Sequence, residues 1–151
     1  MKNPYSAFAM FLVIWYGLFQ AIHLFVNLRG VVQLAAGSID FPALPPPAGW
    51  SPQSIHFMTA IAWLDLFNAI LTLVFVYGYF KRARWQLWLG TLTMTVSMYA
   101  AILFTYATVA AGAWTAENLF SYLFITLAFV PVVVLFCLYS FWAISGRLNE
   151  N

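Results

Sequence analysis

The chain has 151 residues, of which only ten are Lys, Arg, Asp or Glu. These charged residues make up 7% of the sequence, against about 25% in an average soluble domain, while 64% of the residues are hydrophobic and 20% are aromatic. A soluble protein could not cover its surface with so few charges, so the composition excludes an ordinary cytoplasmic enzyme, a disordered chain and a nucleic-acid-binding protein.

Four apolar segments follow one another along the chain, and each exceeds the roughly 20 residues that span a hydrocarbon core of about 30 Å. They predict transmembrane helices over residues 7–33, 54–80, 86–111 and 119–144. Only Asp65 interrupts the second segment. The fold class is therefore expected to be all-α: one polytopic membrane four-helix bundle that occupies the whole chain, residues 1–151.

The charged residues outside the bundle predict its orientation. Four spans put both termini on one side, and that side would carry five of the six basic residues: Lys2, Lys81, Arg82, Arg84 and Arg147. The positive-inside rule then gives both termini inside the cell. We expect an integral protein of the endoplasmic reticulum in a eukaryote, or of the inner (plasma) membrane in a bacterium.

The one long connection, between the first two segments, contains FPALPPPAGWSP. Consecutive prolines favour an extended backbone and have no N–H group to leave unpaired. With Phe41, Leu44 and Trp50 as apolar anchors, this connection is expected to cover one end of the bundle as a cap. The alternative is a flexible loop at the lipid surface.

Polar residues recur within the apolar segments at helical spacing. Stripes of this kind should point into the bundle, because lipid offers them no hydrogen-bond partner. The first segment carries Tyr16, Gln20, His23 and Asn27, the second carries Asp65, Asn68 and Thr72, and the third carries Thr91, Thr95, Tyr99 and Tyr106.

Asp65 lies about 16 Å into its predicted helix, close to the bilayer midplane, where a charged side chain costs about 2.5–3.5 kcal/mol. Such a residue is either functional or a structural hydrogen-bond partner between helices. His23 should lie at a similar depth, so the two could act as a proton relay or bind a ligand amine. A His that is simply satisfied by a neighbouring helix is the alternative. Haem or pigment ligation is disfavoured because the only other His, His56, lies near a helix start.

Aromatic residues crowd the positions expected to face the interior: Trp15, Phe19, Trp63, Phe67, Tyr99, Tyr106 and Phe129. They could hold a rigid apolar ligand or a cation, or simply pack the core. The predicted ligand-binding residues are therefore Gln20, His23, Asn27, Trp63, Asp65, Asn68, Tyr99 and Tyr106. No cofactor or metal is predicted, since the single Cys137 has no partner for a metal-binding spacing.

Two segments resemble the EXPERA family, which includes the emopamil-binding protein, a sterol Δ8–Δ7 isomerase, and the sigma-2 receptor. The segment from Ala21 to Asn27 (AIHLFVN) is similar to the family's first-helix motif, and the segment from Trp63 to Arg82 is similar to its second helix, in which an acid precedes a basic turn. The resemblance implies a four-helix fold with a ligand pocket between the helices. It also implies that His23 and Asp65 match the helix-one histidine and the helix-two acid.

The chain departs from the isomerase pattern at three positions. Asn27 stands where the first helix has an acid, and an amide cannot shuttle protons. Counted from Pro131, Ile125 and Ala128 stand where the isomerase has Asn and Trp. These departures favour binding without isomerisation.

Three functions follow as hypotheses. The first is an integral membrane protein that binds an apolar or amphiphilic ligand of sterol or isoprenoid type, with Asp65 and His23 as polar anchors. The second is an enzyme, an intramolecular isomerase acting on a sterol or isoprenoid double bond, with His23 and Asp65 as catalytic residues. The third is a small accessory subunit of a larger membrane complex, or a homodimer, whose polar stripes serve packing.

Overall fold

The computed structural model describes residues 5–36 and 43–145. Within these residues it contains four α-helices and no strand: α1 (Ala7–Ala35), α2 (Pro52–Phe80), α3 (Gln86–Ala110) and α4 (Leu119–Ile144). Each is long and apolar enough to cross a membrane. The predicted bounds are confirmed to within two residues at every helix end, and the all-helical fold class is confirmed with them.

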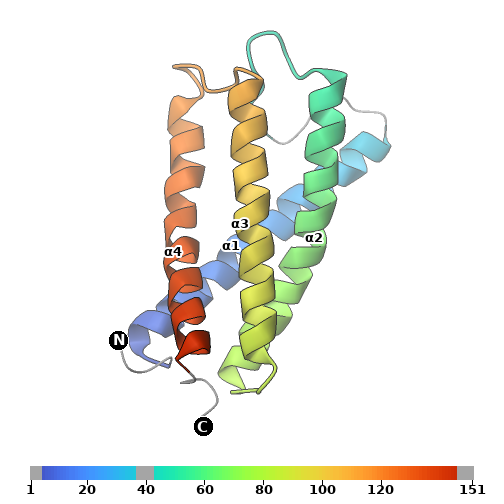
Figure 1. The fold of residues 1–151 in the computed structure, drawn as a ribbon. Coiled ribbons are helices and arrows are strands. Elements are labelled where there is room, and N and C mark those ends of the chain that lie inside the picture. The colour runs from blue at the N-terminus through green and yellow to red at the C-terminus, as the bar shows by residue number, and fades with distance from the viewer. Residues whose placement is uncertain (1–4, 37–42, 146–151) are drawn as a thin grey trace.

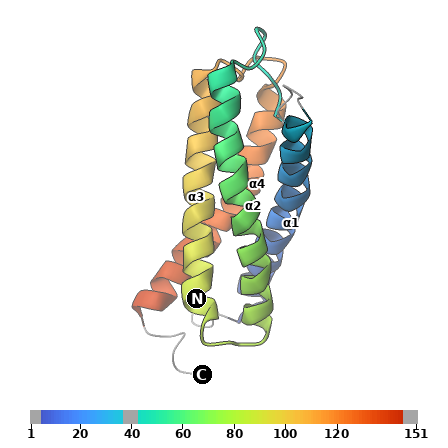
Figure 2. The ribbon, with the colours of Figure 1, turned by 90° about the vertical axis from the view of Figure 1, so that its right-hand side faces the viewer.

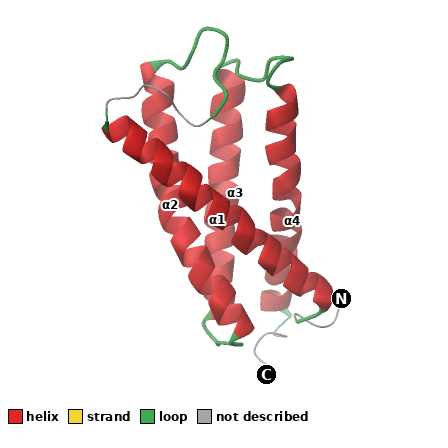
Figure 3. Cartoon of the chain, turned by 180° about the vertical axis from the view of Figure 1, so that it is seen from behind, coloured by secondary structure: helices red, strands yellow, loops and turns green. Residues whose placement is uncertain are grey.

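The helices run up and down in turn, so that α1 begins and α4 ends at the same end of the bundle (Figure 1). Backbones approach one another in the pairs α1–α2, α2–α3, α3–α4 and α4–α1, so α1 and α3 face each other across the bundle. Helix α1 is the most inclined, and in the rear view of Figure 3 it crosses in front of the other three. Its 29 residues, about 44 Å at 1.5 Å per residue, exceed the thickness of a hydrocarbon core and allow such a tilt.

The helix ends carry recognisable signals. Ser51 precedes α2 and its hydroxyl accepts a hydrogen bond from the Ser54 N–H at 3.1 Å, while Pro52 occupies the first helical position. Gly112, at φ 72°, ends α3, and the N–H of Ala113 donates to the carbonyl of Thr108 at 3.0 Å. This is the turn that glycine favours after a helix, because it lacks a Cβ.

The turn between α2 and α3 ends α2 in the same way but without glycine. Arg82 adopts φ 51°, and the N–H of Ala83 donates to the carbonyl of Gly78 at 2.9 Å. The Arg82 guanidinium lies 4.9 Å from the centre of the Tyr5 ring, so the turn is attached to the start of α1 by a cation–π contact. This contact joins the start of α1 to the α2–α3 turn, at the end of the bundle where α4 also ends (Figure 2).

The well-packed core occupies the half of the bundle next to this turn. Its largest buried side chains come from the start of α1 and α3 and from the end of α2 and α4, and they include Tyr16, Phe75, Tyr79, Tyr139 and Trp142. The opposite half, beside the cap and the α3–α4 connection, contains a cavity. The functional candidates lie in that half.

Candidate functional site

A cavity of about 390 Å³ lies between the four helices at the cap end of the bundle. All four helices contribute to its wall, and most of the lining is aliphatic or aromatic. Polar lining side chains come from all four helices, and those on α1, α2 and α3 include Gln20, His23, Asn27, Asp65 and Ser97. Ligand sites in proteins are usually apolar cavities of about 300–1,000 Å³ with a few converging polar groups, so this cavity has the volume and the lining of a site for one small molecule.

The cap closes one end of the cavity. Ala43 and Leu44 line it, and the Tyr122 hydroxyl on α4 donates to the Leu44 carbonyl at 2.6 Å. Asn118 donates from its side chain to the Pro45 carbonyl at 2.9 Å, which attaches the proline run to the start of α4. The predicted cap is thus confirmed for residues 43–51, whereas the anchor predicted at Phe41 lies outside the described residues.

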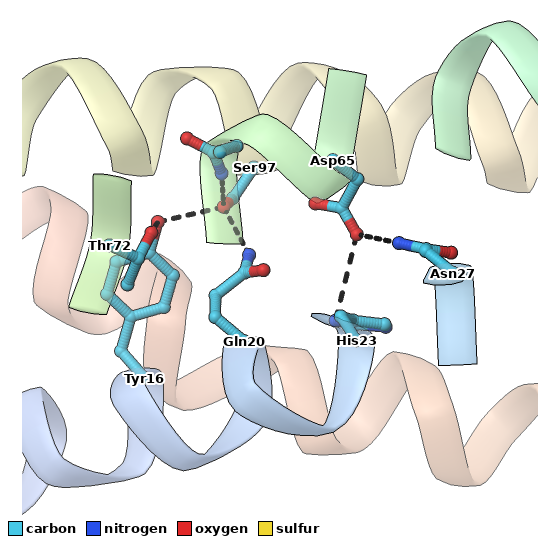
Figure 4. Close-up of polar contacts among 8 residues, drawn as sticks. Tyr16, Gln20, His23, Asn27, Asp65, Thr72 and Ser97 are labelled. Atoms are coloured by element: carbon cyan, nitrogen blue, oxygen red, sulfur yellow. Dashed lines mark hydrogen bonds and ion pairs between the residues drawn. The ribbon is translucent and has the colours of Figure 1, made fainter. Parts of the chain in front are cut away.

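Asp65 brings α1 and α2 together inside the cavity. Its Oδ2 atom accepts a hydrogen bond from the Asn27 side-chain amide at 2.9 Å, and the same oxygen lies 4.0 Å from Nδ1 of His23 (Figure 4). At 4.0 Å the His23 contact is electrostatic and too long for a hydrogen bond. The Phe19 ring packs edge-on against the imidazole, with ring centres 4.3 Å apart, and holds its orientation.

A second cluster of polar side chains lies about one helical turn nearer the start of α1 (Figure 4). Ser97 on α3 is its centre: its hydroxyl oxygen accepts from the Gln20 side chain at 2.7 Å and from the Asn68 side chain at 2.8 Å. It is also 2.8 Å from the Tyr16 hydroxyl, which in turn accepts from Thr72 at 3.1 Å. These five residues form the Ser97 network, which connects three helices and separates the cavity from the packed core.

Two acceptors in this region lack a donor. Gln20 is 1% exposed, and its Oε1 atom has no hydrogen-bond partner; the same is true of Oδ1 of the buried Asn68. Gln20 lines the cavity as a residue, but its Oε1 atom is itself buried. In Figure 4 this amide oxygen points toward the side on which Asp65 lies. Among the acceptors in this region, Asp65 is the acidic one that lines the cavity, and its side chain is 13% exposed.

The predicted site residues divide into two groups. Gln20, His23, Asn27 and Asp65 line the cavity together, and Asn68 lies behind it in the Ser97 network. The other three do not line the cavity and lie on the outer surface: Trp63 is 45% exposed, Tyr99 57% and Tyr106 71%. The expectation that these three aromatics, and Phe67 with them, face the interior is wrong, while Phe19 and Phe129 do line the cavity.

Helix α3 shows why the prediction that its polar residues point into the bundle was wrong. Thr95 is exposed and Thr91 is half-buried, and their hydroxyls donate to the carbonyls of Thr91 and Leu87 in the preceding turn, at 2.8 and 2.9 Å. A threonine that bonds to its own helix in this way needs no partner from another helix. The interior face of α3 instead carries Gly90, Thr93 and Ser97.

Sequence reasoning also missed the contribution of the α3–α4 connection. Trp114 lines the cavity, its ring stacks on Tyr122 with centres 5.2 Å apart, and its indole N–H donates to Thr108 at 2.9 Å. Within the described residues no group of three or more His, Cys, Asp or Glu side chains is arranged to hold a metal ion. The site is thus built from hydrogen-bonding and apolar groups.

The helices above are those of an integral membrane protein by length and composition. No protein-family model matches the sequence, and no curated protein and no solved structure matches it.

Proposed function

We propose that the protein binds an apolar or amphiphilic ligand of sterol or isoprenoid type within the membrane, in the cavity between its four helices. The observation that carries the proposal is the composition of the wall: an aliphatic and aromatic lining with one acidic side chain, Asp65, on the inside. A carboxylate at this depth is retained at a cost, and a ligand that pairs with it offsets that cost. The EXPERA-like segments, which include His23 and Asp65, support the same assignment.

The Asp65 carboxylate narrows the kind of ligand. Asp65 lines the cavity and stays partly accessible, and Asn27 already supplies one donor to it. A ligand whose polar end is a hydrogen-bond donor, and above all a protonated amine, supplies a further, charge-assisted partner. Phe19 and Phe129 line the cavity beside this region and can pack against the apolar part of the ligand.

A matched pair of ligands tests the proposal. Farnesylamine and farnesol have the same chain, but only the amine carries a charge. The Asp65→Asn variant should bind farnesylamine about ten- to a hundredfold more weakly, because a charge-assisted hydrogen bond is worth about 1.5–3 kcal/mol and 1.4 kcal/mol is tenfold. Its affinity for farnesol should change little, which serves as the control for folding. Equal loss for both compounds, or no loss for the amine, would remove Asp65 as the anchor.

Isomerisation is the second candidate, and one observation favours it: His23 and Asp65, 4.0 Å apart, both line the cavity. A pair of this kind can move a proton to and from a double bond. Against it, the position of the helix-one acid is held by Asn27, whose amide donates to Asp65. The purified protein, incubated with a Δ8 sterol, decides the matter: turnover that disappears in His23→Ala would support catalysis, and absence of turnover leaves binding as the function.

We also propose that both termini face the cytosol. Lys81, Arg82 and Arg84 lie in the α2–α3 turn, at the end where α1 begins and α4 ends, so the basic residues gather on one side. Single cysteines placed in this turn and in the cap, in a Cys137→Ser background, test the orientation with a membrane-impermeant thiol reagent. Labelling of the turn from outside intact cells would refute the orientation.

A further inference from the structure

An apolar groove of about 460 Å³ runs along the outer face of the bundle between α3 and α4. On α3 it extends from Met98 to Val109, about 16 Å at 1.5 Å per residue, and on α4 it is bounded by Phe129 and Val133. No charged residue lines it. The groove faces the region that lipid chains would occupy, and it is long enough for an extended alkyl chain.

The groove and the internal cavity have a common wall. Ala101, Thr105 and Phe129 line both of them. Two of these side chains are small, and Thr105 lines the cavity while it is also exposed on the outer surface. Phe129 is the only large side chain in the common wall, and its ring lies 5.7 Å from that of Phe19 inside the bundle.

We propose that the groove is the second part of the same binding site and holds the apolar tail of a single-chain amphiphile whose polar end lies at Asp65. This inference rests on the function proposed above. The cavity alone, at about 390 Å³, is near the lower limit for ligand sites, so a long-chain molecule needs an exit from it. The wall formed by Ala101, Thr105 and Phe129 is where a second apolar volume adjoins the cavity.

The proposal also specifies what the tail contributes. A chain that leaves lipid for the groove gains no hydrophobic free energy, because both surroundings are apolar. The polar end at Asp65 therefore provides the selectivity, and attachment to it raises the local concentration of the tail at the groove. Tail occupancy of the groove should consequently depend on the Asp65 carboxylate, whereas filling by ordinary lipid should not.

Photocrosslinking in lipid nanodiscs tests this. Two farnesylamine probes are used, one with a diazirine at the far end of the chain and one with a diazirine next to the amine. The end-labelled probe should modify groove residues such as Ile102, Tyr106 and Val133, and the probe labelled near the amine should modify cavity residues. Both patterns should disappear in Asp65→Asn and in excess unlabelled farnesylamine.

A bulky substitution in the common wall tests the same proposal, and the same substitution elsewhere on α3 is its control. Thr105 and Thr95 are both exposed threonines of α3, but only Thr105 lies in the common wall. Thr105→Phe should abolish groove labelling by the end-labelled probe, and Thr95→Phe should not change it.

The outcomes separate the two proposals. If cavity labelling depends on Asp65 but the tail labels another face, the groove assignment is refuted and the proposed function stands. Groove labelling that persists in Asp65→Asn also overturns the groove assignment and identifies the groove as ordinary lipid-facing surface. Absence of any labelling that depends on Asp65 overturns the proposed function, and the groove assignment with it.

Discussion

The Ser97→Ala variant is the most direct test of the packing between α1, α2 and α3. The substitution removes one hydroxyl group and no carbon framework, so it creates almost no cavity. That hydroxyl is buried and has three side-chain partners, in Tyr16, Gln20 and Asn68, at 2.7–2.8 Å. Its loss leaves two amide donors and one phenol without this shared partner.

The size of the effect follows from these three bonds. A hydrogen bond between membrane helices contributes about 0.6 kcal/mol on average and about 1.7 kcal/mol at most. Three bonds therefore give about 2 kcal/mol, and a buried donor left without a partner adds to this, at about 1–3 kcal/mol each in soluble proteins. We expect Ser97→Ala to lower the free energy of unfolding by about 2–4 kcal/mol.

Reversible unfolding in mixed micelles, with an increasing fraction of sodium dodecyl sulfate, measures this change. Thr95→Ala is the matched control on the same helix, because Thr95 is exposed and donates only to its own backbone; it should change stability by less than about 0.5 kcal/mol. In a double-mutant cycle, Gln20→Leu should cost about 0.6–1.7 kcal/mol less in the Ser97→Ala background than in the wild type. Equal stability losses for the two alanine variants would refute the reasoning.

Three further changes test other parts of the structure. Asn27→Ala removes the donor at 2.9 Å from the Asp65 carboxylate and should lower stability by about 1–2 kcal/mol in the same assay; a loss no greater than the surface control contradicts the contact. Tyr122→Phe removes the bond to the cap backbone and should speed amide hydrogen exchange in residues 43–50 without changing exchange in the packed core; unchanged exchange in the cap argues against the bond. Gly90→Ala places a Cβ atom 2.5 Å from a ring carbon of Phe75 and should cost about 1–3 kcal/mol, more than Gly17→Ala, whose Cβ lies 3.1 Å from its nearest neighbour; the reverse order refutes this packing.

The fold was predictable because the signals for membrane helices are strong. Long apolar segments separated by charged or proline-rich connections leave little choice of boundary. Helix α2 starts two residues before the predicted start because Ser51 caps it and Pro52 fits its first position. The tilt angle of α1 was not predictable, because the length of an apolar segment allows a tilt without setting its angle, which depends on packing against neighbouring helices.

The site was predictable where polar side chains have no alternative partner in their own helix. Asp65, His23, Asn27 and Gln20 are of this kind, and all four line the cavity. The interior polar stripe predicted for α3 was wrong because a threonine hydroxyl can bond to a carbonyl in the preceding turn of its own helix. The better signal was the series of small residues at Gly90, Thr93 and Ser97, which lets helices approach closely.

The side on which each aromatic residue lies was the least predictable feature. Tyr99 and Tyr106 are largely exposed, and Trp63 is almost half exposed. An aromatic side chain is as stable against lipid chains as against other helices, so hydrophobicity alone does not decide its orientation in a membrane.

The unequal filling of the two halves of the bundle has a consequence for how the protein moves. Around Phe75, Tyr139 and Trp142 the helices are fully packed, so their amides should exchange with solvent only when the whole molecule unfolds. The cap half surrounds an open volume and has fewer packed contacts, so it should open locally at a lower free energy. The Ser97 network lies at the boundary between the two. If the cavity binds a ligand as proposed, the ligand would therefore stabilise the cap half selectively, and that half is also the one expected to open most readily.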